Sequence, residues 1–462
     1  MLVDVVKGGA EIEMGSKRLK RLFGFIGLIL LFIVAEMVVS YFVLPVANYG
    51  IAVIASRNEH NGQIDTVLLG ASMTGNGIDP AVLDEQLGSA SFNMATNAQT
   101  MRMSYYALRD AIATNDIKRA VIEISINRMS RDVQEDEGVT KVVFIDYLTD
   151  PATKLAYAWD NYSLNDIPQL LLSSVRCQLR FAVNGIGYKL DWDYLKHYAA
   201  HGYALAPINP GLPKDQGYVA FTDRIKRGGG GMDAPTPASA TEVYATDESK
   251  TNLEELMKLV ALCREHDIQV TFVTVPCADT WLLGYADSYQ QAHDHFAKIS
   301  AELGVPYFDF NYSKQLRTEL RDRSFRDPKH LNDSGAQLFT AQLVRALNGE
   351  LSAADFHADY AQATASIQRV AGMILRRARR PDNAAVASSR QPEGIVPEYR
   401  FFAKKTGADN AEYQLLQDYS ADNRCELSSL SPGRYTLRAE SRAAGVSTAE
   451  YDAYANLDVT VR

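Results

Sequence analysis

Two short motifs, far apart in the chain, carry side chains that can perform acyl chemistry together. Ser72 ends the stretch Leu-Gly-Ala-Ser after an apolar run, and Asp327 and His330 belong to the stretch Asp-Pro-Lys-His-Leu-Asn. A serine nucleophile, an imidazole base and a carboxylate that orients the base are the minimum set for attack on an ester carbonyl. We therefore predict these three catalytic roles; the alternative is that each is a turn residue or a helix cap.

The elements that must position these residues follow from an alternation of apolar and amphipathic segments. The apolar, strand-like segments are short, and they cover 65–70, 90–95, 119–126, 269–275 and 305–310. Amphipathic helical patterns follow them, which predicts βαβ units and a parallel sheet covered on both faces. The predicted fold class is α/β, a three-layer flavodoxin-like sandwich over about residues 60–350. Ligands bind beyond the carboxyl ends of such strands, where both motifs fall.

Donors for a developing oxyanion are expected in the neighbouring loops. The N–H of Ser72 opens the helix after the first strand, Asn97 and Ala98 follow the second strand, and Asn127 follows the third. Because these loops open at one sheet edge, we predict an oxyanion hole made by the Ser72 N–H, the Ala98 N–H and the Asn127 amide. The Asn97 side chain is the alternative donor, and both asparagines could instead be loop-capping residues.

These blocks resemble those of the SGNH/GDSL hydrolase superfamily over about residues 64–348. Gly-Ala-Ser, ending at Ser72, stands where the family has a Gly-Asp-Ser-like block. Ala98 replaces the usual glycine, and Asn127 lacks the usual Gly-x-Asn-Asp context, whereas the Asp-x-x-His block that ends at His330 matches closely. The resemblance implies an ester hydrolase or acyltransferase with a Ser72–His330–Asp327 triad and no cofactor.

One long apolar run precedes this domain. Residues 22–44 include a single charge, Glu36, and at about 1.5 Å per residue they can cross a hydrocarbon core of about 30 Å. Four basic residues precede the run, so we expect residues 1–21 in the cytoplasm and the rest outside, on a single-pass anchor in the cell membrane. A cleaved signal peptide is the alternative. Glu36 either stays neutral or reaches the interface, or it contacts another membrane protein.

The remaining segments complete the predicted organisation. Residues 128–248 form an aromatic-rich insertion that ends in a run of four glycines, and its rings either offer a platform for sugar or lipid or form its own core. Residues 351–397 are predicted to be a helical and polar linker, and residues 398–462 a small β-sandwich module of short antiparallel strands.

In organisation the chain is similar to D-alanyl-lipoteichoic acid biosynthesis proteins and to cell-envelope O-acetylation proteins. That similarity implies acyl transfer to or from an envelope polysaccharide or a teichoic-acid-like polymer, alongside a multi-pass membrane acyl carrier. A non-catalytic scaffold of the same fold, binding glycan or a membrane acyltransferase, is the alternative function.

Composition excludes some other functions. The net charge of −9 argues against nucleic acid as a partner. The four cysteines lack metal-binding spacing, and we expect no metal site. Cys263 and Cys277 could form a disulfide or remain as two buried free thiols.

Overall fold

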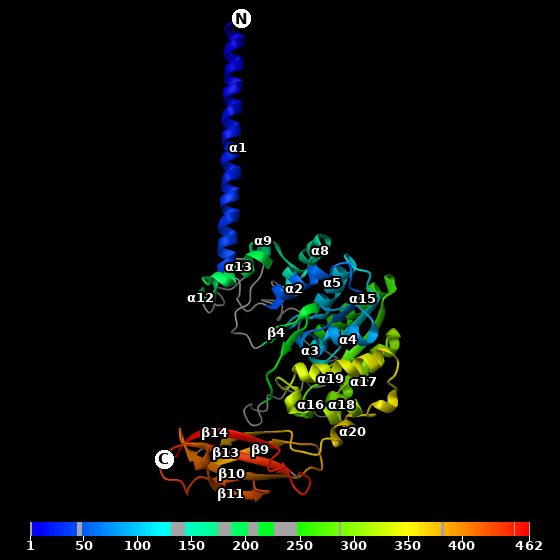
Figure 1. Cartoon of the computed structure of the whole chain (residues 1–462), viewed down its shortest axis with the longest axis vertical. Helices are drawn as coiled ribbons and strands as arrows, with labels where there is room; N and C mark the ends of the chain where they lie inside the picture. Colours follow the sequence, from blue (N-terminus) through cyan, green and yellow to red (C-terminus); the bar gives the residue numbers. More distant parts are fainter. Residues whose placement is uncertain are drawn as a thin grey trace.

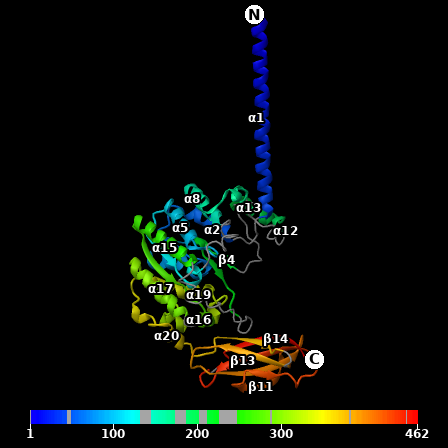
Figure 2. The same cartoon turned by 180° about the vertical axis from the view of Figure 1, so that it is seen from behind.

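The computed structural model describes residues 2–43, 49–130, 144–172, 175, 186–201, 211–225, 247–285, 288–379, 383–447 and 449–461. A long N-terminal helix, an α/β domain and a C-terminal β module follow one another along the molecule (Figure 1; Figure 2). Helix α1 (Leu2–Val43) rises from one end of the α/β domain, and the β module lies at the opposite end.

The α/β domain is built on a parallel sheet of five strands in the order β2-β1-β3-β6-β7. The strands are β1 (Thr66–Leu69), β2 (Ser91–Asn93), β3 (Arg119–Glu123), β6 (Gln269–Thr274) and β7 (Tyr307–Asp309). The side chains of Val67, Leu68 and Leu69 in β1 are fully buried. Each such side chain contributes about 1.5–3 kcal/mol on burial. All five predicted strands are present, which confirms the α/β class.

Helices cover both faces of this sheet. Helix α5 (Met101–Ile112) packs against α15 (Asp247–Glu265), and α4 (Pro80–Leu87) packs against α19 (Asp333–Leu347). The other described α-helices of the domain and its insertion are α2 (Tyr49–His60), α3 (Ser72–Gly77), α6 (Ile126–Met129), α8 (Pro151–Asn161), α9 (Ile167–Leu171), α12 (Ile186–Lys189), α13 (Trp192–His201), α16 (Asp279–Tyr285), α17 (Ser288–Leu303) and α18 (Lys314–Glu319).

Helices α4 and α5, which follow the loops at the active-site edge, each begin with a side-chain cap. Asp79 accepts a hydrogen bond from the Ala81 N–H at the start of α4, where Pro80 occupies the first helical position. Thr100 accepts from the Met103 N–H at the start of α5. Such caps typically contribute about 1 kcal/mol each, so the loops at this edge end at defined residues.

The insertion contains helices α8 to α13 and a hairpin of β4 (Gly211–Pro213) and β5 (Val219–Phe221). Its predicted aromatic residues divide between the two roles considered, because Tyr157 is buried in the domain core whereas Trp159 and Trp192 are exposed. The predicted glycine run at 228–231 lies outside the described residues.

Helix α1 carries the apolar run. Among the described residues, Arg21–Val43 is the single helical segment long and apolar enough to cross a membrane, as an anchor or a signal sequence would. The Glu36 carboxylate accepts a hydrogen bond from the Ser40 hydroxyl, one turn further on, at 3.0 Å. Ser40, on the same helix, therefore supplies one of the hydrogen bonds that the Glu36 carboxylate requires.

The C-terminal module is two antiparallel sheets around one core, with strand orders β11-β10-β13-β14 and β12-β9-β8. Its strands are β8 (Gly372–Arg377), β9 (Ala384–Arg390), β10 (Pro397–Lys405), β11 (Gln414–Ser420), β12 (Arg424–Glu426), β13 (Gly433–Ala443) and β14 (Ala453–Val461).

The prediction of a helical and polar linker over 351–397 is wrong for most of its length. A short helix, α20 (Tyr360–Ala365), is present, but β8 and β9 follow it and belong to the module. The small side chains of β9 made this segment look like a linker. Ala384, Ala385 and Ala387 are fully buried, and Ala385 and Ala387 belong to the core between the two sheets.

Candidate active site

The structure brings the three predicted catalytic side chains together. Ser72 is the first residue of α3, directly after β1, while Asp327 and His330 lie in the loop before α19. The Ser72 Oγ lies 2.8 Å from His330 Nε2. The His330 Nδ1 lies 2.9 Å from each carboxylate oxygen of Asp327. All three residues are at least partly exposed, so a substrate can reach the hydroxyl.

The electrostatics of Asp327 favour its role as an orienting carboxylate. Burial opposes its ionisation, but hydrogen bonds from the His330 ring and from the Lys329 and His330 N–H groups outweigh burial and lower the pKa of Asp327. An ionised carboxylate accepts the Nδ1–H of the imidazole. His330 Nε2 is then left as the acceptor that faces the Ser72 hydroxyl.

The loop that carries Asp327 and His330 is fixed from its C-terminal side. The Asn332 Oδ1 caps α19 by accepting from the Gly335 N–H at 3.1 Å, and its Nδ2 donates to the carbonyls of Asp223 and Arg323. A Cβ at Gly335 would lie 2.1 Å from the Ser324 carbonyl oxygen. The helix cap therefore explains why asparagine occupies position 332, and the close contact with Ser324 explains why glycine occupies position 335.

A buried carboxylate, Glu123, holds the loop that carries Ser72. It accepts hydrogen bonds from the Ala71 N–H at 3.0 Å, from the Thr74 hydroxyl at 2.7 Å and from the Ser125 hydroxyl at 3.0 Å. A Cβ at Gly70 would lie 2.7 Å from the Glu123 Oε2, so glycine is required there. Glu123 is not among the residues predicted for the site, although a lone carboxylate inside an apolar strand was a visible signal.

Arg128 holds the second loop in the same way. Its buried guanidinium donates to the carbonyls of Gln99 and Thr100 at 3.3 Å, and to the carbonyl of Glu123. The segment it fixes carries Ala98, whose φ of 54° lies in the left-handed region. This conformation is one that glycine adopts more readily than alanine. Arg128 also escaped the sequence analysis.

The predicted oxyanion donors are not equally placed. Asn97 is exposed and Ala98 half-buried. Asn127 accepts a hydrogen bond on its Oδ1 from the Tyr285 hydroxyl at 3.3 Å, and Tyr285 accepts from Trp281 Nε1 at 3.1 Å. This chain turns the Asn127 amide so that its NH₂ group is left to donate elsewhere. Among the described residues, no hydrogen bond joins Asn97, Ala98 or Asn127 to Ser72.

The lining of a small cavity includes Met73, the residue after the serine, but neither Ser72 nor His330. The volume of the cavity is about 20 Å³, and the lining also includes Asn127, Cys277, Trp281 and Tyr285. About 10–15 Å³ on this measure accommodates one water molecule, so the space suits a group no larger than a few heavy atoms.

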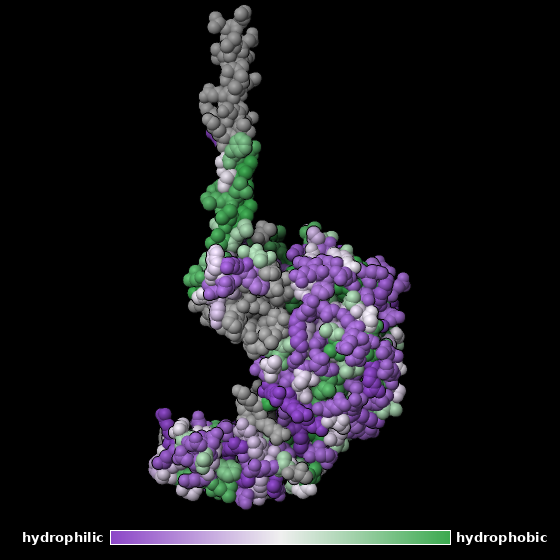
Figure 3. Space-filling view, in the orientation of Figure 1, coloured by the Kyte–Doolittle hydropathy of each residue, from purple (hydrophilic) through white to green (hydrophobic). Residues whose placement is uncertain are grey.

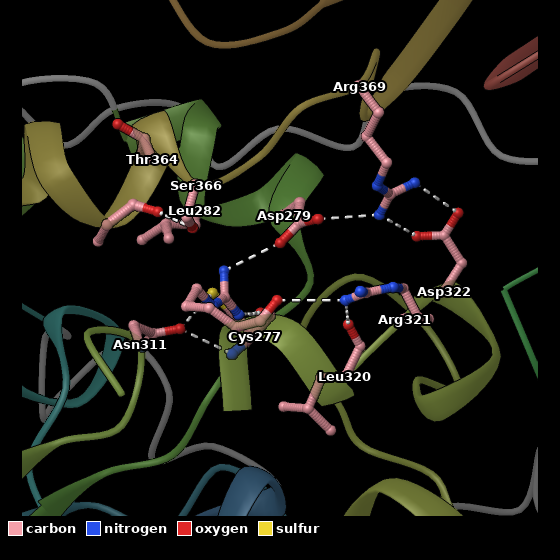
Figure 4. Close-up of polar contacts among 12 residues, drawn as sticks. Cys277, Asp279, Leu282, Asn311, Leu320, Arg321, Asp322, Thr364, Ser366 and Arg369 are labelled. Atoms are coloured by element: carbon pink, nitrogen blue, oxygen red, sulfur yellow. Dashed lines mark hydrogen bonds and ion pairs between the residues drawn. The ribbon is translucent and has the colours of Figure 1, made fainter. Parts of the chain in front are cut away.

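The segment that carries the lining residues Cys277 and Trp281 is held by ion pairs (Figure 4). Arg317 donates to Asp279 at 2.9 Å and to the Cys277 carbonyl at 3.0 Å. Arg369, just before the β module, donates to both Asp279 and Asp322 at 2.9 Å. The connection to the C-terminal module therefore stabilises this segment.

The insertion borders the opposite side through β5 and the residues after it. The Asn76 amide donates to the Val219 carbonyl at 3.1 Å, and the Ile225 N–H donates to the Phe325 carbonyl at 2.8 Å. The Arg326 guanidinium lies 3.7 Å from the centre of the Phe221 ring. This part of the insertion thus contacts the elements on both sides of the triad.

Neither a metal cluster nor a disulfide is found in the described part of the chain. It contains no group of three or more His, Cys, Asp and Glu side chains that could hold a metal ion. Cys263 and Cys277 are free and buried. Burial raises the pKa of each of these thiols to about 12, so both stay protonated and unreactive at neutral pH.

Comparisons with known proteins give a distant likeness. No protein-family model matches the chain, and no curated protein matches it. A lipase/acylhydrolase from Enterococcus faecalis aligns with 12% identity and a TM-score of 0.29, over 64% of this chain and 100% of its own. A GDSL-like lipase from Bacteroides thetaiotaomicron aligns with 11% identity and a TM-score of 0.29, over 66% of this chain and 100% of its own. Identities and TM-scores this low do not establish what chemistry the site performs, so the assignment depends on the geometry of the site itself.

Proposed function

We propose that this protein is an SGNH-type serine esterase or O-acyltransferase. The observation that carries the proposal is the continuous hydrogen-bond chain from Asp327 through His330 to the Ser72 hydroxyl. If Ser72 were only a turn or capping residue, its function would not require an imidazole at 2.8 Å. If His330 were only a capping residue, its function would not require a hydrogen bond between Nε2 and a serine. Glu123 strengthens the proposal because it fixes the backbone on which the nucleophile sits.

The reaction proceeds in two balanced halves. The Ser72 Oγ attacks the acyl carbonyl carbon while its proton passes to His330 Nε2, and the carbonyl electron pair moves onto oxygen. Collapse of this intermediate breaks the bond to the alcohol, which leaves with the proton from His330, and the acyl group remains on Ser72. In the second half, His330 Nε2 takes the proton of an acceptor hydroxyl, whose oxygen attacks the acyl carbonyl carbon. The bond to the Ser72 Oγ then breaks, and the proton returns from His330 to Ser72. Water as acceptor gives an esterase, and a sugar or polyol gives a transferase.

Oxyanion stabilisation is assigned to three donors, the Ser72 N–H, the Ala98 N–H and the Asn127 NH₂. Strands β1, β2 and β3 run parallel, so the loops that carry these donors leave the sheet at one edge. The orientation imposed by Tyr285 favours Asn127 over Asn97 as the side-chain donor.

The acyl group we propose is short, such as acetyl. The cavity beside Met73 has room for a methyl group, and its wall is fixed by Arg317 and Arg369. We further propose that α1 anchors the domain outside the cell membrane, where the acceptor is an envelope polysaccharide or a teichoic-acid-like polymer. A multi-pass membrane acyl carrier, contacted at Glu36, would supply the acyl group.

A fluorophosphonate probe tests the enzyme against a non-catalytic scaffold. The full-length protein in detergent micelles should gain one probe mass on a peptide that contains Ser72, and the Ser72→Ala variant should gain none. Equal labelling of both variants, or no labelling of the folded wild type, would count against the enzyme. An added polyol then separates the two outcomes, because only a transferase yields the acylated polyol from a model acetyl ester.

The location is tested separately. A reporter fused after residue 60 should be active only on the outer side of the membrane, because four basic residues precede the apolar run. Activity of a cytoplasmic reporter from the same fusion would remove the envelope substrate while leaving the chemistry intact.

A further inference from the structure

The large apolar side chains exposed outside α1 are concentrated in one region of the described chain. Six of them in the insertion are more than half exposed: Leu155, Trp159, Leu164, Ile186, Leu190 and Trp192. Soluble surfaces rarely gather so many, and such a group marks an interaction site. Their type matters too, because tryptophan beside leucine is typical of a membrane interface.

These side chains lie at the end of the domain from which α1 rises. Both views place α12 and α13 beside the base of α1 and α8 further along the same end of the domain, and Figure 1 shows α9 between them (Figure 1; Figure 2). The hydrophobic surface of α1 continues onto the adjoining insertion helices (Figure 3).

Direct contacts join the insertion to the last turn of α1. The Tyr41 hydroxyl donates to the Lys189 carbonyl at 2.7 Å, and the Lys189 ammonium donates to the Phe42 carbonyl at 2.6 Å. The Tyr41 ring lies 4.9 Å from the Tyr198 ring and 6.4 Å from the Tyr194 ring, between centroids. The position of α12 and α13 relative to the apolar run is therefore defined.

The length of α1 determines the depth at which Tyr41 and its contacts lie relative to a lipid bilayer. At ~1.5 Å per residue, the helix advances about 30 Å from Leu22, after the last basic residue, to Tyr41. This equals the thickness of a hydrocarbon core of about 30 Å. Tyr41 and its ring partners then lie at the outer interface, and the exposed tryptophans of the insertion lie beside them.

We propose that α8, α9, α12 and α13 form a platform that lies in the outer bilayer interface, with Trp159 and Trp192 inserted among the lipids. The occupant of the apolar surface is the lipid bilayer itself. The proposal rests on the anchoring of α1 that is part of the proposed function. It implies that the catalytic edge is held at a defined height above the membrane instead of swinging on a free tether.

Tryptophan quenching by brominated lipids tests the platform. The chain has three tryptophans, and Trp281, the third, is buried in the cavity wall. Three single-tryptophan variants, with phenylalanine at the other two positions, are reconstituted as full-length chains in phosphatidylcholine vesicles with or without bromine at carbons 6 and 7. We expect emission from Trp159 and Trp192 to fall at least twofold in brominated vesicles, and emission from Trp281 to stay unchanged.

The outcomes separate the platform from the anchor. If Trp159 and Trp192 are unquenched while the chain resists an alkaline wash, the platform is overturned and the anchor stands. If both are quenched in a chain that the wash removes, the platform stands and the anchor is overturned. If both are unquenched in lipid yet shielded from aqueous acrylamide in native membranes, a protein covers the surface and the bilayer proposal is overturned.

Discussion

The Glu123 carboxylate accepts a hydrogen bond from the main-chain N–H of Ala71, the residue that precedes Ser72. It also accepts from the Thr74 hydroxyl in the first turn of α3. The end of β3 thus fixes both sides of the serine, so the hydroxyl meets His330 without rearrangement. Pre-positioning of this kind is where much of the rate enhancement of an enzyme originates.

The triad should behave as a unit. Ser72→Ala and His330→Ala should each lower kcat on a model acetyl ester by about 10³-fold or more, because either loss prevents formation of the acyl-enzyme. Asp327→Asn should lose less than His330→Ala, since the carboxylate only orients the imidazole and stabilises its charge. Steady-state kinetics with circular dichroism as a folding control measure this, and near wild-type turnover in either alanine variant would refute the assignment.

Glu123→Gln should impair catalysis through the position of Ser72. The amide cannot accept from all three donors, so we expect a loss of about 1–3 kcal/mol in stability. A displaced nucleophile should lower kcat by between about 10- and 100-fold with little change in KM. Glu255→Gln is the matched control, because Glu255 is similarly buried but pairs with Arg102, away from the site. An equal loss of kcat in both variants would indicate a merely structural role for Glu123.

Asn127→Ala should remove one oxyanion donor. We expect kcat to fall by about 10²–10³-fold at nearly constant KM, because the amide acts on the transition state. Tyr285→Phe should lower kcat by only about fivefold, since it removes the hydrogen bond that orients the amide. Asn115→Ala is the control and should retain full activity. Asn115 precedes β3, whereas Asn127 follows it, so Asn115 lies at the end of the strand away from the site, where it accepts from the Gly62 N–H. If Asn127→Ala is also fully active, another group completes the oxyanion hole.

The buried thiols should resist modification in the folded protein. Burial raises the pKa of Cys263 and Cys277 to about 12, and that of Cys425 to about 11, so the reactive thiolate is scarce at pH 8. In a Cys177→Ser background, Ellman's reagent should label no thiol in the native state and three after unfolding without reductant. One thiol after unfolding would instead indicate a Cys263–Cys277 disulfide.

The strand pattern was predictable because the central strands of the parallel sheet are largely buried and rich in apolar residues, as in β1, where all four residues are buried. β9 was not predictable on this basis. Its alanines and serines have little strand propensity, and Ala385 and Ala387 are buried only because they pack in the core between the two sheets. The positioning groups Glu123 and Arg128 were also missed, because local sequence does not reveal which backbone groups a buried charge will meet.

The sequence by itself determined the fold class and the apolar run before it, since these depend on periodicity, and it predicted Ser72, Asp327 and His330 as site residues from residue types at the ends of strands. Only the tertiary structure decided that the Ser72 hydroxyl lies 2.8 Å from the His330 ring, which is 258 positions away in the chain. It also decided that the Asn127 amide is turned by Tyr285, and that the exposed side chains of the insertion share one end with α1. Such distances follow from how strands and helices pack, and packing is a property of the whole chain.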